Sequence, residues 1–287
     1  MIRIALPNKG RLTDEIRDVL DDAGLPIRGK SERSLSAKLG DEFEAIFVRA
    51  QDIPEFVADG AADAGITGWD LVSESGRSEL VSLLDLGLGR CRLVIAATED
   101  SGIRSVADLA ARTTRTRVAT SFPRLARGWF DAQKIPVDVV PVSGACEIAP
   151  HLGIADVIAD LTSSGSTLKM NGLIEFATVV ESSARLIARK ETAELTPVRE
   201  LSVALASVLR ARDQRYLMAN VPKAALEKVR ECLPGLNGPT LSEVFGGSRF
   251  VAMHAVVPAA NVYRTIASLK LLGCEGILVT RIERLMP

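Results

Sequence analysis

Short apolar strands alternate with helices and polar turns along most of the chain, and this alternation limits the possible folds more than any other feature. Residues 3–6 predict a strand, and residues 7–11 a turn into a helix that runs to about Ala23 and ends at Gly24. Further strands are expected at residues 44–48, 64–66, 93–97, 118–120 and 137–140, and helices at 51–59, 106–110 and 125–133. The pattern predicts an α/β fold with parallel sheets, in which ligands lie at the carboxyl ends of strands.

Residues 156–168 combine an expected strand with an unusual loop. The apolar residues within 157–161 predict a buried strand, with Asp156 at its start and Asp160 near its end. The residues that follow are all small and polar, and we call them the hydroxyl loop: Thr162, Ser163, Ser164, Gly165, Ser166 and Thr167. Hydroxyls and backbone N–H groups before a helix suit a phosphate, and carboxylates suit sugar hydroxyls. The alternative is a polar turn that only caps the helix.

Basic residues occupy the first turn of the chain. Lys9 and Arg11 flank Gly10 at the start of the first expected helix, where positive charge opposes the helix dipole. That conflict favours a role in binding a polyphosphate over a plain solvated turn. The turn at residues 67–70 also follows an expected strand, so we expect these two turns and the hydroxyl loop to share one cleft.

The pattern changes after about Ala211. Strands are expected at residues 216–221, 240–244, 250–257 and 276–282. Pro222 and Pro258 are expected as first helical residues, with Gly235 and Gly273 near the helix ends. The resulting βαββαβ order is the ferredoxin-like arrangement and predicts a separate small domain. Oligomerisation and effector binding both remain open as its role.

Composition excludes several classes of partner. The 287 residues carry a net charge of −1, from 35 basic and 36 acidic residues, which argues against bulk electrostatic binding to nucleic acid or membrane. No apolar run approaches the ~20 residues of a membrane span, and the N-terminus has no signal-peptide pattern. Cys91, Cys146, Cys232 and Cys274 show no C-x-x-C spacing, which predicts reduced thiols. We therefore expect a cytoplasmic protein.

A longer array of residues around the hydroxyl loop resembles a known signature. It comprises Glu147, Gly153, Ala155, Ile158, Asp160, Leu161, Ser164, Gly165, Thr167 and Leu168. This array resembles the signature of ATP phosphoribosyltransferases, the first enzymes of histidine biosynthesis, at every one of those positions. The resemblance extends to residues 6–12, to residues 65–71 and to the C-terminal domain. The chain looks like the long form of that family.

The resemblance implies a domain organisation and a mode of regulation. Two catalytic lobes of type II periplasmic-binding-protein-like fold would comprise residues 1–92 with 181–211, and residues 93–180, with the chain returning near Val180. Residues 212–287 would form a regulatory domain of ferredoxin-like βαββαβ fold that binds histidine as allosteric inhibitor. Members of the long form need no separate regulatory subunit and interconvert between dimers and hexamers, so a homo-oligomer is expected.

The implied reaction is attack by N1 of ATP on C1′ of phosphoribosyl pyrophosphate, with inversion and release of diphosphate. Such transfer needs a pocket for the 5′-phosphate, acids for the ribose diol, cations for the diphosphate and usually Mg²⁺, here held mainly through substrate phosphates. The hydroxyl loop, Asp156 and Asp160 are assigned to phosphoribosyl pyrophosphate. Lys9, Arg11 and Glu147 are the expected catalytic residues, although Glu147 also suits plain helix capping.

The expected nucleotide-binding residues follow other strands: Gly10, Arg49, Trp69, Asp70 and Phe122. A carboxylate at Asp70 suits the amino group of adenine and the Trp69 indole suits stacking, although core packing is the ordinary role of a tryptophan. An ion pair of Arg49 with Asp52 is an equal alternative to a role in the cleft. The family commonly has tyrosine at the position of Phe122, so only stacking is expected there.

Two alternative functions remain open. A two-lobed α/β chain also serves simple small-molecule binding or effector sensing. A phosphoribosyltransferase with another acceptor, such as a free base or an amine, would need the same donor site. Absence of an export segment and the carboxylates before the hydroxyl loop favour the enzyme over the binding protein.

Overall fold

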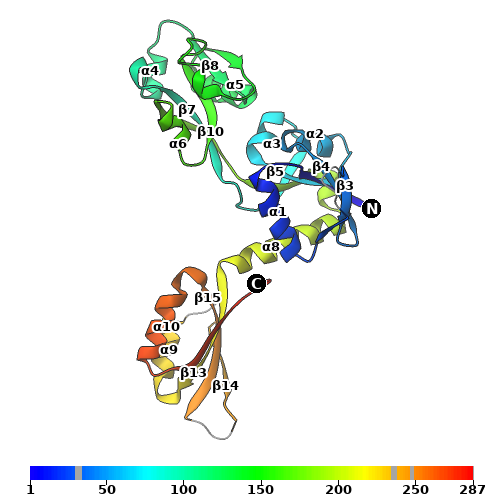
Figure 1. Ribbon diagram of the computed structural model, residues 1–287, viewed down its shortest axis with the longest axis vertical. Helices are drawn as coiled ribbons and strands as arrows, with labels where there is room; N and C mark the ends of the chain where they lie inside the picture. Colours follow the sequence, from blue (N-terminus) through cyan, green and yellow to red (C-terminus); the bar gives the residue numbers. More distant parts are fainter. Residues whose placement is uncertain (30–33, 234–237, 246–248, 287) are drawn as a thin grey trace. The chain divides into compact units, whose positions relative to one another are not determined.

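The structure is a computed structural model that describes residues 1–29, 34–233, 238–245 and 249–286. The chain forms two compact units, one made of Met1–Asp18 and Leu25–Ser202 and the other of Val19–Gly24 and Val203–Pro287. Figure 1 shows both units and labels many of their helices and strands. No helix among the described residues is long and apolar enough to cross a membrane.

A seven-stranded sheet forms one lobe of the first unit, in the order β2-β3-β4-β1-β5-β12-β6. Its strands are β1 (Ile2–Pro7), β2 (Ile27–Arg28), β3 (Ser36–Leu39), β4 (Phe43–Val48), β5 (Ala64–Gly68), β6 (Leu80–Asp85) and β12 (Ala184–Arg189). The associated helices are α1 (Arg11–Asp22), η1 (Ala50–Asp52), α2 (Ile53–Ala58), α3 (Trp69–Ser75), α7 (Lys190–Ala193) and α8 (Thr196–Arg212). Strand β1 is parallel to β4 and β5, so the turns after these strands lie at one edge of the sheet.

A five-stranded sheet forms the other lobe, in the order β11-β7-β10-β8-β9. Its strands are β7 (Cys91–Thr98), β8 (Thr116–Thr120), β9 (Val137–Pro141), β10 (Val157–Thr162) and β11 (Leu173–Ser182). Its helices are η2 (Glu99–Ser101), α4 (Val106–Ala110), α5 (Pro123–Ala132), η3 (Cys146–Ile148) and α6 (Ser166–Met170). The expected two-lobed α/β core is confirmed.

The expectation of parallel sheets is wrong in part, because both sheets are mixed. Strands β8, β9 and β10 are parallel, whereas β7 runs antiparallel to β10 and β11. Strand β12 inserts antiparallel between β5 and β6. Sequence reasoning missed β2, β3, β6, β11 and β12. Strands β2 and β3 form an antiparallel pair without a helix between them, and β6, β11 and β12 pair antiparallel with strands that are distant in the chain. Neither arrangement follows from the alternation of strand and helix.

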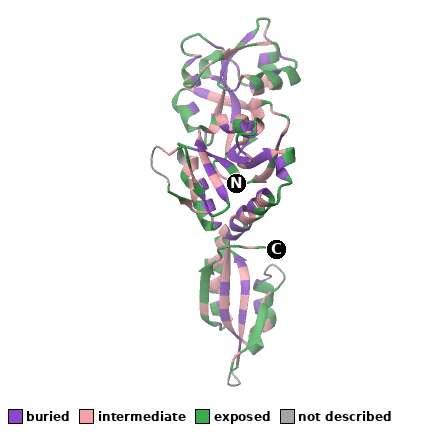
Figure 2. Ribbon diagram, turned by 90° about the vertical axis from the view of Figure 1, so that its right-hand side faces the viewer, coloured by how far each residue is buried: buried purple, intermediate pink, exposed green. Residues whose placement is uncertain are grey.

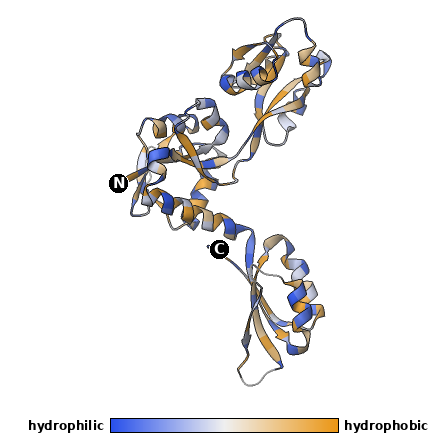
Figure 3. Ribbon diagram, turned by 180° about the vertical axis from the view of Figure 1, so that it is seen from behind, coloured by the Kyte–Doolittle hydropathy of each residue, from blue (hydrophilic) through white to orange (hydrophobic). Residues whose placement is uncertain are grey.

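The central strands of the second lobe are buried on both faces. Along β7, Leu93 and Ile95 pack into one apolar cluster and Val94 into another on the opposite face. Strand β10 repeats this division, with Val157 in the first cluster and Ile158 in the second. Figure 3 shows hydrophobic residues along the strands and a mixture of hydrophobic and hydrophilic residues on the helices. Continuous apolar strands therefore reflect cover on both faces of the sheet.

The C-terminal unit contains a four-stranded antiparallel sheet in the order β14-β15-β13-β16. Its elements are β13 (Gln214–Pro222), η4 (Lys223–Ala225), α9 (Leu226–Cys232), β14 (Thr240–Glu243), β15 (Phe250–Pro258), η5 (Ala259–Asn261), α10 (Val262–Leu271) and β16 (Glu275–Arg281). Buried residues alternate with partly exposed ones along β13 and β15 (Figure 2). The predicted βαββαβ order is confirmed, with one face of the sheet in the core.

Two details of the C-terminal helices differ from expectation. Pro222 and Pro258 are the last residues of β13 and β15, and each precedes a 3₁₀ turn instead of opening an α-helix. An extended conformation with ψ near 132° at Pro222 is compatible with the fixed φ of proline, so the residue suits a strand end equally well. Gly273 is confirmed at a helix end with φ of +78°. Gly235 lies outside the described residues.

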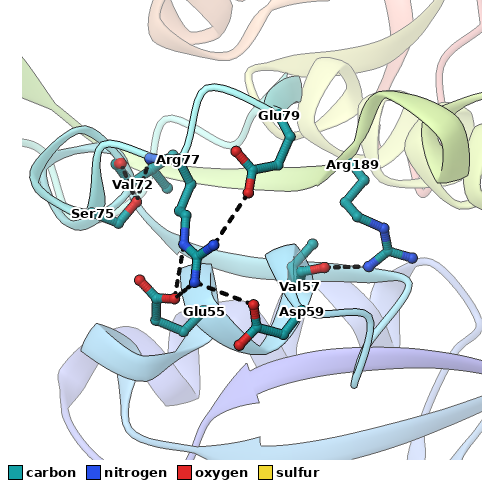
Figure 4. A network of polar contacts seen from close by, with 8 residues as sticks. All are labelled: Glu55, Val57, Asp59, Val72, Ser75, Arg77, Glu79 and Arg189. Atoms are coloured by element: carbon teal, nitrogen blue, oxygen red, sulfur yellow. Dashed lines mark hydrogen bonds and ion pairs between the residues drawn. The ribbon is translucent and has the colours of Figure 1, made fainter.

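An arginine in the loop between α3 and β6 holds several elements of the first lobe together (Figure 4). The Arg77 guanidinium donates to Glu55 of α2, with Nε at 2.9 Å, and contacts Asp59 at 3.2 Å and Glu79 at 3.5 Å. The hydrogen bond from Arg77 is the main cause that lowers the pKa of Glu55; burial raises this pKa, and the charge of Arg77 lowers it further. The network joins α2 to the loop before β6.

Replacing Arg77 is expected to reduce stability in a pH-dependent way. A carboxyl whose pKa is lowered by folding stabilises the folded state above its unfolded pKa, and that stabilisation is lost as pH falls through the folded value. Thermal unfolding of Arg77→Met and of the unchanged chain, measured from pH 7 to pH 3, should therefore differ most near neutrality and converge in acid, below the ordinary Glu55 pKa of 4.5. A difference in Tm that stays constant across this range would contradict the role of the Glu55 pair.

Candidate functional site

The turn after β1 places a lysine at the edge of the first sheet. Asn8 N–H bonds Val48 O at 2.8 Å, and Thr13 N–H bonds Gly10 O at 3.0 Å, which closes the turn into α1. Gly10 has φ of +105°, a conformation that glycine adopts without strain. Lys9 is exposed. Arg11 is the first residue of α1, and its side chain lies outside what the structure describes.

Arg49 emerges at the same edge of this sheet. Pro7 of β1 pairs with Val48 of β4, so Arg49 follows the strand next to the Lys9 turn. Its side chain is exposed, and no ion pair joins it to Asp52 within the described chain. The structure therefore brings Lys9 and Arg49 to one edge and leaves the positive charge of Arg49 available.

Trp69 and Asp70 begin α3 directly after β5 and contact the strand that returns from the second lobe. The Arg185 guanidinium carbon lies 4.3 Å from the centroid of the Trp69 ring. Asp70 is only 5% exposed, and its Oδ1 accepts a hydrogen bond from Ser182 Oγ at 2.5 Å. Its N–H donates to the same hydroxyl at 2.9 Å. The Asp70 carboxylate is thus buried behind Ser182, and one Trp69 face is already stacked on a cation.

Two residues of the hydroxyl loop fix its backbone, and the side chains of the other four are exposed. Thr162 Oγ1 is buried and accepts from Gly165 N–H at 2.8 Å. Gly165 has φ of +76° before α6, a left-handed conformation that favours glycine. Ser164 and Ser166 share a hydrogen bond of 2.9 Å between their hydroxyls, and both are exposed with Ser163 and Thr167. Thr162 and Gly165 therefore set the backbone, and exposed hydroxyls remain for a ligand.

Two carboxylates lie beside this loop without a cation. Asp160 is the third residue from the end of β10, and its Oδ1 accepts from Leu161 N–H at 2.8 Å. Burial raises the pKa of Asp160; the Leu161 N–H lowers it, and the negative charge of Glu147 in η3 raises it again. Burial also raises the pKa of the adjacent Cys146 to about 11, with Asp160 as the next cause. Neither carboxylate makes an ion pair within the described residues.

The structure places Asp156, which was assigned to the ribose, at a distance from the hydroxyl loop. Asp156 precedes β10, at the opposite end from the hydroxyl loop, and roughly 13 Å of strand separates it from Asp160. Its Oδ2 accepts from Arg117 N–H at 2.7 Å, and its Oδ1 lies 3.5 Å from Arg112. These partners hold Asp156 as a structural ion pair away from the loop.

Phe122, which was assigned to nucleotide stacking, is buried in the second lobe. Its ring is 6% exposed and packs in the core cluster that contains Leu93 and Phe130. Its N–H bonds Thr120 Oγ1 at 2.9 Å, which fixes the turn into α5. An apolar ring without a hydroxyl gains more from this core than from water, so burial favours a packing role for Phe122.

A cavity of about 300 Å³ lies where the chain crosses between the two sheets. Its lining includes Ser163 of the hydroxyl loop together with residues of the crossing segments: Asp85, Arg90, Cys91, Arg92, Glu181, Ser182, Ser183 and Arg185. Sequence reasoning missed all of these except Ser163. The signal available was the run of Gly, Arg and Cys at residues 87–92, which separates two strands of different sheets. The lining carries three arginines and two carboxylates, Asp85 and Glu181, and so combines charges of both signs.

Charged partners order one side of this cavity. Arg92 pairs with Glu175 at 2.9 Å, and Arg185 lies 4.0 Å from Asp85. Burial raises the pKa of Asp85, but hydrogen bonds from Ser183 and from Gly87 N–H, with the charge of Arg185, lower it overall. Asp85 is therefore ionised at neutral pH.

A larger cavity of about 800 Å³ lies between α3 and α5. Glu74 lines it and accepts hydrogen bonds from Arg124 N–H at 2.8 Å and Leu125 N–H at 2.9 Å, so it caps α5. None of the sequence-predicted site residues lines this cavity. The smaller cavity, which includes Ser163, is the better candidate for the substrate site.

Comparison with known proteins identifies the family of the chain. The family described as HisG, ATP phosphoribosyltransferase, matches residues 49–210, and the HisG C-terminal domain matches residues 211–284. An ATP phosphoribosyltransferase of Gemmatimonas aurantiaca is 64% identical over 293 residues, covering 100% of both chains. That of Haloarcula marismortui is 49% identical over 286 residues, covering 99% of this chain and 100% of the relative.

A solved structure is similar over most of the chain. The ATP phosphoribosyl transferase (HisG:HisZ) complex from Thermotoga maritima gives a TM-score of 0.63 at 25% identity, covering 73% of this chain and 99% of that chain. The enzyme is therefore favoured over the alternative of a two-lobed binding protein. The chain belongs to the ATP phosphoribosyltransferase family, the pentosyltransferases of the first step of histidine biosynthesis.

Proposed function

We propose that the chain transfers the phosphoribosyl group of phosphoribosyl pyrophosphate to N1 of ATP and releases diphosphate. The observation that carries this assignment is the hydroxyl loop beside the unpaired carboxylates Asp160 and Glu147. Ser163 of this loop also lines the cavity of about 300 Å³. The family supplies the substrates, and these residues give each substrate group a partner.

The donor binds at the end of β10 in this proposal. Exposed hydroxyls of Ser163, Ser164, Ser166 and Thr167 hold the 5′-phosphate, because each can donate one hydrogen bond to a phosphate oxygen. The Asp160 carboxylate accepts hydrogen bonds from the ribose hydroxyls. As the bond from C1′ to diphosphate breaks, positive charge develops on the ribose, and the negative charges of Asp160 and Glu147 stabilise it.

The acceptor side uses the edge of the first sheet. Lys9 and Arg49 supply positive charge for diphosphate or triphosphate, and Arg11 with Gly10 stays part of this prediction. Trp69 and Asp70 shape the neighbouring wall, with Asp70 acting through Ser182 because its carboxylate is buried behind that hydroxyl. The reaction needs no nucleophile from the protein, since N1 of the adenine attacks C1′ directly.

Magnesium fits this site as a partner of the substrates. The described residues contain no group of three or more His, Cys, Asp or Glu side chains able to hold a metal. Asp160 and Glu147 provide carboxylate oxygens, the ligand type that Mg²⁺ prefers, and Mg²⁺ is commonly bound by one or two carboxylates plus substrate phosphates. When bound, the ion neutralises the charge of the leaving diphosphate.

The C-terminal unit is proposed as the site of feedback inhibition by histidine. It forms a compact unit of its own and matches the C-terminal domain of the family over residues 211–284. The relative from Thermotoga maritima is a complex with a second protein, HisZ. We propose that this chain instead works as a homo-oligomer, between dimer and hexamer, without a separate regulatory subunit, and in the cytoplasm.

The activity is tested by incubating the full chain with ATP, phosphoribosyl pyrophosphate and Mg²⁺. Diphosphate and a nucleotide adduct linked through N1 are the expected products, identified by NMR. Chelation of Mg²⁺ should stop the reaction and added Mg²⁺ should restore it. Folded protein that forms no adduct from these substrates would refute the proposed reaction, and an adduct with a free base or amine would favour the other acceptor.

Removal of residues 212–287 is expected to abolish inhibition by histidine while some catalysis remains. The physical reason is that the effector site lies in a unit with its own core, whereas the hydroxyl loop and Asp160 lie in the first unit. Initial rates with and without histidine measure the effect, with circular dichroism as the control for folding. Inhibition that survives the truncation would place the effector site outside the C-terminal unit.

A further inference from the structure

Two adjacent serines line the cavity between the sheets, and each is bonded to a carboxylate. Ser182 and Ser183 are both 6% exposed. Ser182 Oγ lies 2.5 Å from Asp70 Oδ1, and Ser183 Oγ lies 2.6 Å from Asp85 Oδ1. A serine hydroxyl has one proton and two lone pairs, so the partner that takes the proton decides what the hydroxyl can offer a ligand.

The proton of Ser183 is committed to Asp85. The Asp85 carboxylate also accepts from Gly87 N–H at 2.8 Å and lies near the Arg185 guanidinium, and its lowered pKa keeps it ionised. An ionised carboxylate only accepts hydrogen bonds, so Ser183 must be the donor. Among the described residues, none donates a hydrogen bond to Ser183 Oγ. The lone pairs of Ser183 Oγ therefore remain available for a ligand group that donates a hydrogen bond.

Ser182 differs from its neighbour in this respect. Its Oγ donates to Asp70 and already accepts from Asp70 N–H at 2.9 Å. Burial and the charge of Asp70 raise the pKa of Cys91, so a protonated thiol lies beside the same hydroxyl. Ser182 is therefore supplied with donors by the protein, and Ser183 is the serine with unused acceptor capacity.

We propose that Ser183 is a specificity-determining residue that accepts a hydrogen bond from the exocyclic amino group of the adenine ring. This inference rests on the proposed function, in which ATP is the acceptor. Phosphate oxygens only accept hydrogen bonds, so they cannot bond to the lone pairs of Ser183. Ribose hydroxyls can act as donor or acceptor, so they do not require an acceptor at this position. The amino group of adenine is a donor, whereas a base with a 6-oxo group presents an acceptor that Ser183 cannot serve.

The surroundings of Ser183 also suit a base. Arg185 lines the same cavity, and its guanidinium plane, stacked over Trp69 at 4.3 Å, offers a flat surface. Ser163 on the cavity wall belongs to the hydroxyl loop, so a base here lies next to the proposed donor site. Because the acceptor state of Ser183 is set by Asp85, Asp85 is a positioning residue for adenine selection.

The experiment compares three nucleotides on the full chain by calorimetric binding. They are ATP, purine riboside 5′-triphosphate, which lacks the amino group, and inosine 5′-triphosphate, which has a 6-oxo group. The unchanged chain should bind ATP about tenfold more tightly than the purine analogue, as expected for one hydrogen bond. Ser183→Ala should bind these two nucleotides equally. The asparagine of Asp85→Asn can donate an amide N–H to Ser183, which frees the Ser183 hydroxyl proton for a ligand. This variant should therefore bind inosine triphosphate more tightly, relative to ATP, than the unchanged chain does.

The outcomes separate this inference from the proposed function. Equal binding of ATP and the purine analogue by the unchanged chain would overturn the role of Ser183 without using any variant. A preference of Ser183→Ala for ATP over the purine analogue that equals that of the unchanged chain would also overturn it. If Ser183→Ala lost affinity only for phosphoribosyl pyrophosphate, the role of Ser183 would be assigned to the ribose instead. Failure of the unchanged chain to join ATP to phosphoribosyl pyrophosphate would instead count against the proposed reaction.

Discussion

Asp160→Asn is expected to lower kcat/KM for phosphoribosyl pyrophosphate by about 10- to 100-fold, the effect of losing charge-assisted hydrogen bonds to a ligand. The same substitution is expected to stabilise the free protein at neutral pH. Burial and the charge of Glu147 raise the pKa of Asp160, and no cation among the described residues offsets its negative charge. The Asp160 carboxylate is therefore expected to contribute to substrate binding and to lower the stability of the free protein.

The sign of the stability effect follows from the raised pKa. A carboxyl with a raised folded pKa favours the folded state when protonated, and this advantage disappears as pH rises from the unfolded value of 3.8 through the folded value. Asparagine has no charge to desolvate, so its stabilising effect should be present near neutrality and vanish below the unfolded pKa. Thermal unfolding between pH 3 and pH 8 measures this difference, and steady-state kinetics measures the activity.

Asp156→Asn is the matched control for this prediction. Asp156 flanks the same strand but pairs with Arg112 and Arg117 at the far end. Its substitution should leave the KM for phosphoribosyl pyrophosphate unchanged and should lower stability, the reverse of the expectation for Asp160. Equal losses of activity in the two variants would contradict the assignment of the ribose site to Asp160 alone.

Gly65→Ala is expected to destabilise the first unit by about 1–3 kcal/mol through overpacking. A Cβ atom on Gly65 would lie 2.6 Å from Ile53 Cγ2, 3.0 Å from Val57 Cγ2 and 3.3 Å from Ala5 Cβ. Gly65 belongs to β5, and its neighbours Ile53 and Val57 on α2 are fully buried, so none of them has room to move. Chemical denaturation would measure the loss as a lower midpoint with an unchanged slope.

Gly128→Ala is the control for a glycine in open space. Gly128 lies within α5, and a Cβ there meets no atom within 4 Å. Alanine favours a helix over glycine by about 0.5–1 kcal/mol, so this variant should be more stable than the unchanged chain. If both variants lose the same stability, the close packing of β5 on α2 is not the cause.

The local elements of the site follow directly from the sequence. The hydroxyl loop joins a buried strand to a helix as predicted: Thr162 ends β10, Ser166 begins α6, and Gly165 between them adopts φ of +76°. The C-terminal βαββαβ order was also predictable, since each turn there carries its own Pro or Gly. Neighbouring residues decide these features, so no knowledge of distant contacts is needed.

The partners of residues on one strand, and the pairing of strands within the sheets, could be known only from the tertiary structure. Asp156 and Asp160 have the same side chain and lie on the same strand segment of the sequence. Arg112 and Arg117 form ion pairs with Asp156, whereas Asp160 forms no ion pair among the described residues. Phe122 follows a strand end, where ligands are common, but the core takes its ring. Antiparallel strands β11 and β12 carry no local signal because their hydrogen bonds go to strands far away in the chain.

The sequence by itself determined the family, the hydroxyl loop and the order of elements, because motif spacing and turn residues are local properties of the chain. Only the tertiary structure decided which carboxylate stays unpaired and which serine can accept a hydrogen bond. It also assembled the cavity from residues 85–92, residues 181–185 and Ser163, which are distant in sequence. These are pairwise contacts across the fold, and the free energy of burying each polar group depends on partners that the sequence does not place beside it.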